Sequence, residues 1–390
     1  MASRFNVFLI KVLIIIFFIS CSENESLQKT EITVEKNDSV LKSCCENLNK
    51  MNFINNSGKI DLKSIDSINL NVSLRCTQKK MSLIKGGEFM MGASDEQWSL
   101  GREFPRHSVR VSSFLMDIHE VTNKEFKEFT DATGYQTTAE KKVDWEILKK
   151  QLPPGTPKPD DSLLVPGSLV FFQPKKNISN TLDFSQWWKW VKGANWKNPY
   201  GPESNINGIE NHPVVHISYK DAVEYAKWCD KRLPTEAEWE WAARGGLENC
   251  IYPWGNEHIE DGKTKCNYWE GNFPKYNSKK DGFFYTSPVM NYEPNGFGLY
   301  DMAGNVWEIC SDWYDESYYS SLFNNKISDN PKGPATWKYS REPFDPKKVI
   351  RGGSFLCNDS YCASYRVSAR MPYSMDTGMS HTGFRCVKDI

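Results

Sequence analysis

The chain has 390 residues, of which 39% are hydrophobic and 13% aromatic, and its 48 basic residues nearly balance its 49 acidic ones. This balance argues against a nucleic-acid-binding protein, which needs an excess of Lys and Arg. The aromatic content is too high for a disordered chain, and no apolar run is long enough to span a bilayer. The 14 Trp, 25 Gly and 20 Pro residues favour a loop-rich fold with a core of large rings.

The N-terminus has the three parts of an export signal. Arg4 and Lys11 precede a short apolar run, and Cys21 follows a Phe-Ile-Ser sequence that resembles a bacterial lipobox. We therefore expect residues 1–20 to be a lipoprotein signal peptide. Lipid on Cys21 would anchor the exported protein to a bacterial membrane, facing the periplasm or the cell surface. The alternative is an ordinary signal peptide with an incidental cysteine.

Composition divides the rest of the chain into two parts. Residues 21–80 are rich in Ser, Asn, Lys and Glu and predict a lipid-anchored tether, whereas residues 81–390 have a globular composition. Setting Cys21 aside leaves ten of the 11 cysteines, and export favours their pairing. Spacing does not fix connectivity. Cys250 with Cys266 could close a short loop, and this pairing is a guess.

The first elements of the globular part are short. Residues 81–92 predict two strands around a Gly-Gly turn, and residues 109–116 have β-character. Thr122 and Glu125 fit a capping box that begins a helix through about Thr130.

Two further helices are expected downstream. Ser218 opens one whose apolar stripe ends at Cys229, which makes Cys229 a core or disulfide residue. Thr235 caps the other, which Gly245 ends. Residues 150–180, rich in Pro and Lys, are interpreted as a surface excursion. Short strands and turns account for the remainder.

Six stretches together resemble the formylglycine-generating enzyme family, whose members are also called sulfatase-modifying factors. They are residues 84–92, 120–126, 232–240 (RLPTEAEWE), 296–308 (GFGLYDMAGNVWE), 351–355 (RGGSF) and 382–386 (TGFRC). The resemblance runs in order through residues 81–390. It implies a single α+β domain of the formylglycine-generating-enzyme or C-type-lectin-like sort, with little regular secondary structure. The fold alone does not define the activity.

One motif carries the family's chemistry. In competent members, Arg-Gly-Gly-Ser is followed by a Cys-x4-Cys pair, here Cys357 and Cys362. The resemblance implies that the two thiolates bind Cu(I) and that the enzyme uses O₂ to oxidise a sulfatase cysteine, within Cys-x-Pro-x-Arg, to Cα-formylglycine. Soft thiolates suit Cu(I), whereas a zinc site would need two more ligands. The alternative is a structural disulfide, or a separate partner for each cysteine.

The resemblance also implies a substrate pocket. It places Ser354 among the catalytic residues, Trp307 and His381 near the substrate, and Tyr361 between the two thiols. Asn358 stands where some members carry His, and His381 stands where Asn is often found, which leaves the substrate preference open. The alternatives are purely structural: Ser354 would be a turn hydroxyl, and Trp307 and Tyr361 would be core aromatic residues.

Two stretches resemble the family's calcium sites. The implied ligands are Asn267, Tyr268, Asp281 and Phe283 in one site, and Asp301, Gly304, Val306 and Glu308 in the other. Calcium binds hard oxygens from carboxylates and backbone carbonyls, and such an ion would hold loops that lack sheet or helix bonds. The alternative is that these are turn residues bonding their own backbone.

Three functions are compatible with these observations. The first is a copper-dependent oxidase that matures an unfolded or nascent sulfatase. The second is a non-catalytic envelope or gliding-type lipoprotein that uses the same fold as a scaffold. The third, an iron-dependent sulfoxide synthase, is disfavoured because residues 22–80 are too short and too poor in His to form the additional helical domain.

Overall fold

The computed structural model describes residues 80–93, 99–176, 178, 181, 183–323 and 326–390. The expected signal peptide, Cys21 and nearly all of the tether lie outside these residues. Within the described part, no helix is both long enough and apolar enough to cross a bilayer.

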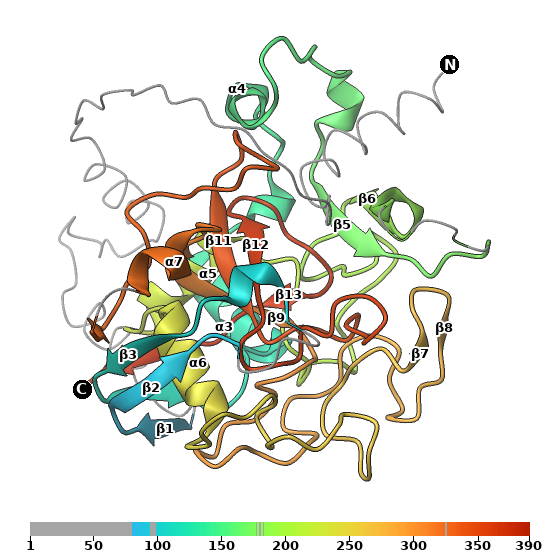
Figure 1. Ribbon diagram of the computed structural model, residues 1–390. Coiled ribbons are helices and arrows are strands. Elements are labelled where there is room, and N and C mark those ends of the chain that lie inside the picture. Colours follow the sequence, from blue (N-terminus) through green and yellow to red (C-terminus); the bar gives the residue numbers. More distant parts are fainter. Residues whose placement is uncertain (1–79, 94–98, 177, 179–180, 182, 324–325) are drawn as a thin grey trace, which may run out of the picture. The chain divides into compact units, whose positions relative to one another are not determined.

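Regular elements are short throughout the described part (Figure 1). The α-helices are α3 (Asn123–Thr133), α4 (Trp145–Leu148), α5 (Tyr219–Trp228), α6 (Glu236–Arg244) and α7 (Tyr318–Leu322). The 3₁₀ turns are η3 (Gly101–Glu103), η4 (Thr138–Glu140), η5 (Lys149–Gln151), η6 (Asp161–Leu163) and η7 (Phe184–Gln186). The fold is therefore α+β with little regular structure, as predicted.

The strands form five small sheets. Their bounds are β1 (Met81–Ile84), β2 (Gly87–Met91), β3 (His107–Val111), β4 (Phe114–Asp117), β5 (Gly167–Phe171), β6 (Trp188–Lys192), β7 (Gly271–Asn272), β8 (Tyr276–Asn277), β9 (Trp307–Trp313), β10 (Ser328–Asp329), β11 (Lys347–Arg351), β12 (Arg370–Ser374), β13 (Thr382–Gly383) and β14 (Val387–Asp389). The sheet orders are β1-β4-β14, β10-β3-β2, β12-β11-β9-β13, β5-β6 and β7-β8. In Figure 1 the four-stranded sheet lies centrally, between β1–β3 with α6 and the hairpins β5–β6 and β7–β8.

The three predicted helices are confirmed, and each begins with its expected cap. The side chains of Thr122, Ser218 and Thr235 each accept a hydrogen bond from the backbone amide three residues on, which satisfies an otherwise unpaired donor. Gly134 and Gly245 end α3 and α6 in the left-handed conformation, so α3 extends slightly beyond the predicted Thr130.

The predicted strands are present, with different partners. β1 pairs with β4, and β2 pairs with β3, so the two strands around the Gly-Gly turn belong to different sheets. The strand expected over residues 109–116 is broken into β3 and β4. A β-carbon on Gly86 would lie 2.5 Å from the carbonyl oxygen of Val111, which explains the glycine at this crossing.

The interpretation of residues 150–180 as a surface excursion is wrong at its centre. β5 is buried along its whole length and pairs with β6 from Gly167 opposite Lys192 to Phe171 opposite Trp188. The Pro and Lys residues that suggested exposure flank this strand, and the short apolar run of residues 169–172 lies among them.

The proposed bridge between Cys250 and Cys266 is also wrong, because both are buried free thiols. Cys310 is also a free thiol, whereas Cys229 is disulfide-bonded. Burial explains why free thiols persist, since solvent oxidants do not reach them.

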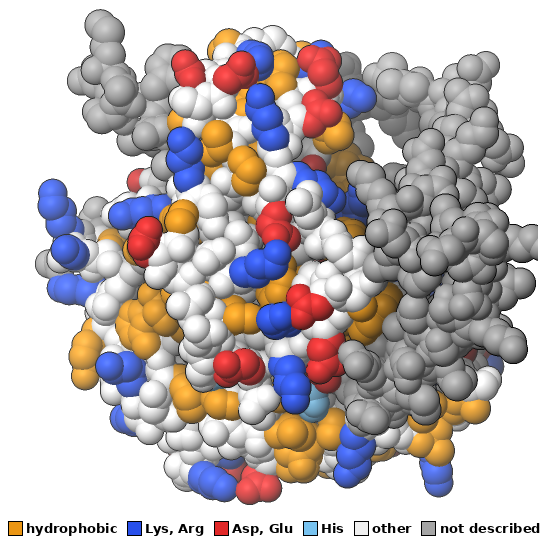
Figure 2. Space-filling model, turned by 180° about the vertical axis from the view of Figure 1, so that it is seen from behind, with side chains coloured by type: hydrophobic (Ala, Val, Ile, Leu, Met, Phe, Trp, Pro, Cys, Tyr) orange, Lys and Arg blue, Asp and Glu red, His pale blue; other side chains and the backbone are white. Residues whose placement is uncertain are grey.

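Charges of both signs are mixed on one face of the molecule. On the face shown in Figure 2, basic and acidic side chains are interspersed with small apolar patches, without a large field of one sign. This agrees with the net charge of −1.

Candidate active site

The two candidate copper ligands lie in one loop, residues 352–369, which joins β11 to β12 and is called the thiol loop below. It begins with Gly352 and Gly353, whose φ angles of 90° and 74° favour glycine. A β-carbon on Gly353 would lie 2.7 Å from the backbone of Ser364, on the returning arm of the loop. The glycine pair of the RGGS motif therefore lets the two arms of the loop pack closely.

The structure brings Cys357 and Cys362 into side-chain hydrogen-bond contact, and both are free. Cys357 is buried, whereas Cys362 is partly exposed. Ser354, also buried, directs its backbone N–H at the sulfur of Cys357, 3.4 Å away. A structural disulfide between the two thiols is therefore absent in this structure, and two soft donors lie together.

The two thiols differ in acidity. Burial and the contact with Cys362 raise the pKa of Cys357 well above its ordinary value. Burial also acts to raise the pKa of Cys362, but hydrogen bonds from Cys357 and Ser364 outweigh it and lower that pKa to about 7. The more exposed residue of the pair is therefore the one whose thiol ionises near neutral pH.

This pair satisfies the donor requirement of Cu(I), for which two soft thiolates can form a low-coordinate site. Among the described residues, no group of three or more His, Cys, Asp or Glu side chains is arranged to hold a metal ion. A tetrahedral zinc site at the thiols therefore lacks its other ligands, whereas a two-sulfur site is complete.

Aromatic side chains pack around the thiol loop. Tyr361, between the two cysteines, stacks on Phe273 at a centroid distance of 4.4 Å and meets Phe184 and Trp187 edge-on at 6.2 and 6.1 Å. Burial raises the pKa of the Tyr361 hydroxyl well above its ordinary value, so it stays protonated. The rings make a rigid, low-dielectric wall beside the sulfurs.

Trp307 and His381 lie side by side. The backbone N–H of Trp307 donates to the carbonyl of His381 over 2.9 Å, at the start of the β9–β13 pairing. Both side chains are buried, and the His381 ring packs 4.8 Å from Trp188. Burial lowers the pKa of His381 to about 3, so its imidazole is neutral.

These two residues connect to the thiol loop through backbone contacts and rings. The carbonyl of Asn305, two residues before Trp307, accepts from Phe355 N–H over 3.0 Å. From His381, the rings of Trp188, Phe171 and Phe273 lead in contact to Tyr361, although no single contact joins His381 to a sulfur.

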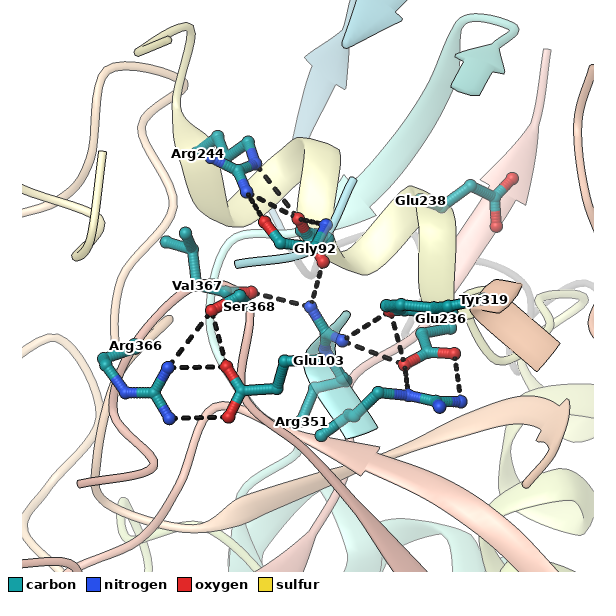
Figure 3. Close-up of polar contacts among 12 residues, drawn as sticks. Gly92, Glu103, Glu236, Glu238, Arg244, Tyr319, Arg351, Arg366, Val367 and Ser368 are labelled. Atoms are coloured by element: carbon teal, nitrogen blue, oxygen red, sulfur yellow. Dashed lines mark hydrogen bonds and ion pairs between the residues drawn. The ribbon is translucent and has the colours of Figure 1, made fainter. Parts of the chain in front are cut away.

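Buried ion pairs fix the start of the thiol loop (Figure 3). Arg351 donates to Glu236 at 2.9 Å and Glu240 at 2.5 Å, both on α6, and to the carbonyl of Val367 at 2.6 Å. Thus two of the motifs found in the sequence, RLPTEAEWE and RGGS, are each other's partners. The bond to Val367 also ties the first arm of the loop to the second.

A second ion pair fixes the end of the loop. Arg366 and Glu103 form a bidentate pair with distances of 2.5 and 2.7 Å, and Ser368 adds a hydrogen bond to Glu103 (Figure 3). Arg366 also donates to the carbonyl of Ala363. Both charged groups are buried, so the pair positions the segment just after Cys362.

The first candidate calcium stretch forms a hydrogen-bonded turn. Asp281 accepts from Phe283 N–H over 2.9 Å, and Asn267 donates to the carbonyl of Tyr285. Burial raises the pKa of Asp281 to about 6, since that carboxylate has no basic partner here. An underneutralised carboxylate fits a cation site, although the turn bonds fit the alternative equally.

The second stretch holds excess negative charge. Burial and neighbouring carboxylates raise the pKa of Glu120 and Asp301, the latter to about 6, and the Oδ1 atom of Asp301 is buried without a hydrogen-bond partner. Glu308 is neutralised by Arg385 at 2.6 and 2.7 Å. The orphaned oxygen of Asp301 fits a cation, with Glu120 as a neighbour that sequence reasoning missed.

Sequence reasoning also missed the residues that surround the thiols. Glu103 is 263 positions from Arg366, and Trp187 and Phe273 are far from Tyr361 in sequence. No local pattern marks such contacts. The RLPTEAEWE motif was the one available signal, because its acidic residues proved to be the partners of Arg351.

The folded thiol loop and its aromatic wall define a domain of the sulfatase-modifying-factor class. Residues 70–390 match the family model described as the sulfatase-modifying factor enzyme 1-like domain, and the chain belongs to this family. A relative from Thermomonospora curvata named formylglycine-generating enzyme is 44% identical, covering 80% of this chain and 94% of the relative. A mouse relative named inactive C-alpha-formylglycine-generating enzyme 2 is 36% identical, covering 78% and 83%.

A solved structure is similar in fold. PvdO from Pseudomonas aeruginosa superposes with a TM-score of 0.51 and 23% identity, covering 80% of this chain and 94% of that one. This supports the α+β fold and carries no information on activity.

Proposed function

We propose that the protein is a copper-dependent oxidase that converts a cysteine in a Cys-x-Pro-x-Arg segment of an unfolded sulfatase to Cα-formylglycine with O₂. The observation that carries the proposal is the contact between two free thiols, Cys357 and Cys362, in a loop braced at both ends. The relative named formylglycine-generating enzyme supports it, being 44% identical over most of both chains. A scaffold has no need for a partly exposed thiol whose pKa is about 7.

Copper bound by the two thiolates would supply the one-electron and O₂ chemistry that side chains cannot provide. Conversion of the client thiol to an aldehyde removes two electrons and releases the sulfur as sulfide. Reduction of O₂ to water takes four electrons, so an external thiol must supply the other pair.

The protein's own residues prepare the site. Cys362 offers a thiolate near neutral pH, and the amide of Ser354 faces the sulfur of Cys357. The ring wall around Tyr361 excludes water from one side of the loop. Trp307 and His381 would contact the client next to the reacting cysteine, where a neutral imidazole does not repel the arginine of the motif.

We further propose that two structural Ca²⁺ ions hold the loops around Asp281 and Asp301, where buried carboxylate charge is left over. Export and a lipid anchor on Cys21 are proposed from the sequence of residues 1–21. An enzyme anchored in this way would lie at a bacterial membrane, where it would meet clients before they fold.

The second candidate function is that of a non-catalytic lipoprotein, and the similarity to a relative named as inactive supports this candidate. The experiment that separates the two uses the purified exported chain loaded with Cu(I), a Cys-x-Pro-x-Arg peptide, a thiol reductant and air. Mass spectrometry should show loss of sulfur and gain of oxygen. Cys357→Ser and Cys362→Ser should abolish conversion, whereas Cys310→Ser, which alters a buried free thiol elsewhere, should not. Full activity of either thiol-loop variant, or no conversion by the copper-loaded protein, would reject the oxidase.

A further inference from the structure

A groove of about 680 Å³ lies at the far end of β5 from the thiol loop. Its apolar lining includes Ile147, Leu163, Trp190 and Phe344. Ile147 and Phe344 are 54% and 41% exposed, so large apolar side chains meet solvent here. Exposed apolar surface that is concave and rimmed by polar residues is typical of a binding site.

The rim of this groove carries more lysines than unpaired carboxylates. Four lysines line it, namely Lys141, Lys142, Lys150 and Lys220. Within the described part of the chain, Asp161 is the carboxylate on which the charge of Lys142 acts, and Asp161 itself forms an ion pair with Lys158. We call this site the lysine-rimmed groove.

The aspartates that line the same groove are already engaged within the fold. Asp144 caps α4 by accepting from the backbone of Glu146, and Asp376 accepts from Gln151 over 2.5 Å. Asp345 is buried against Lys347. Asp144 and Asp376 bond only neutral groups and keep their charge, so four lysines face two unpaired carboxylates. The rim therefore has an excess of positive charge that would attract negative charge from outside.

Two buried segments connect the lysine-rimmed groove to the candidate active site. β5 begins at Gly167 in the groove and ends at Phe171, which packs 6.3 Å from Phe273 in the wall behind Tyr361. Residues 376–381 run parallel to β5 from Gly378 in the groove to His381 beside Trp188. Five residues of strand span roughly 17 Å.

We propose that the lysine-rimmed groove is a second docking site for the client polypeptide, and that it takes an apolar segment bearing acidic side chains about five to eight extended residues from the reactive cysteine. This inference rests on the proposed function, because the client is bound while unfolded. An unfolded chain exposes the apolar side chains that a folded partner would bury, and it can reach both sites at once. Acidic side chains in the segment complement the four lysines.

The test compares one short peptide with two long peptides, and one pair of substitutions with a control pair. The short peptide carries the Cys-x-Pro-x-Arg segment alone, and long peptides add a Leu- and Asp-containing segment before or after it at the stated spacing. Lys142→Glu with Lys150→Glu reverses charge at the groove. Lys85→Glu with Lys124→Glu makes the same net change at exposed lysines elsewhere.

One long peptide should have a KM about tenfold below that of the short peptide at similar kcat, with the advantage lost at high salt. The groove variant should lose this advantage and the control variant should keep it. Equal KM for short and long peptides in the unaltered protein would overturn the proposal. So would equal losses in the groove and control variants.

Failure of the proposed function can be told apart from failure of this inference. If the short peptide is not converted at all, binding of a fluorescent long peptide to Cys362→Ser still tests the groove, and no salt-sensitive binding would overturn it. A dimer in sedimentation that Lys142→Glu with Lys150→Glu dissociates would show that a second copy occupies the groove, which also overturns the proposal.

Discussion

Replacement of Arg366 by alanine should destabilise the domain by about 3–5 kcal/mol, the typical cost of removing one partner from a buried ion pair. Arg366 contributes two short bonds to Glu103, and each side chain is about 1% exposed. In the variant, the carboxylate would remain buried with Ser368 and the amide of Leu100 as donors. Two neutral hydrogen bonds do not balance a charge in a dry site.

Urea unfolding gives the free energy, and a double-mutant cycle isolates the pair. Glu103→Leu combined with Arg366→Met removes both charges, so it should recover at least about 2 kcal/mol of the sum of the single costs. Lys231→Ala is the matched control, because it breaks the buried pair with Asp117 away from the thiol loop. Per folded molecule, the Arg366 variants should lower kcat for the client peptide, and Lys231→Ala should not.

The stability contributed by the Glu103–Arg366 pair should depend on pH, which provides a further test. Burial acts to raise the pKa of Glu103, but the bonds from Arg366 outweigh it and hold that pKa below its ordinary value of 4.5. The pair's contribution is therefore complete above about pH 4.5 and is lost as pH falls through the lowered pKa. The difference between the unaltered protein and Arg366→Ala should narrow in acid. A cost below about 1 kcal/mol at pH 7, or additive costs in the cycle, would refute the reasoning.

Three other outcomes are expected. In copper-free protein, the rate of alkylation of Cys362 by iodoacetamide, followed by peptide mass spectrometry, should rise with pH with a midpoint near pH 7. In Cys357→Ala this midpoint should move toward pH 9. A midpoint near 9 in both proteins would contradict the contact between the thiols. Without Ca²⁺, thermal unfolding should show stability falling by about 3 kcal/mol as pH rises from about 4 through 6, because burial raises the pKa of Asp301 to about 6 and the folded state therefore favours its neutral form. In Asp301→Asn, stability should change little over this pH range. Parallel curves of stability against pH for the unaltered protein and the variant would contradict the role given to Asp301. Gly304→Ala should lower the free energy of unfolding in urea by more than about 3 kcal/mol, since its β-carbon would lie 2.1 Å from a carbonyl oxygen. Gly298 has a similar φ angle but open space around it, so Gly298→Ala should lower the free energy of unfolding by about 1 kcal/mol.

The helices could be predicted because their signals are local. Thr122, Ser218 and Thr235 each cap a helix through a residue three positions away, so a short window of sequence contains the whole interaction. β5 could not be recognised in the same way. The apolar run of β5 is short and lies among Pro and Lys residues. Its burial depends on pairing with β6, which begins at Trp188.

The thiol pair was predictable from a contiguous motif, whereas its surroundings were not. Glu103 and Phe273 reach the thiol loop through tertiary contacts that leave no trace in spacing. The wrong pairing of Cys250 with Cys266 has the same origin, since proximity in sequence did not bring the sulfurs together and burial protects each one.

The position of β4 constrains how the domain is assembled. β4 pairs with β1 on one side and with β14 on the other, so Met81 and Val387 lie about 10 Å apart across a single strand. A growing polypeptide cannot complete this sheet until almost the last codon has been translated, and the edge of β4 that pairs with β14 stays unpaired until then. Because residues near 81 and 390 are neighbours in the closed sheet, a short linker could join the two ends of residues 81–390. A circular permutant of this segment, opened at a surface turn, should therefore keep the native architecture.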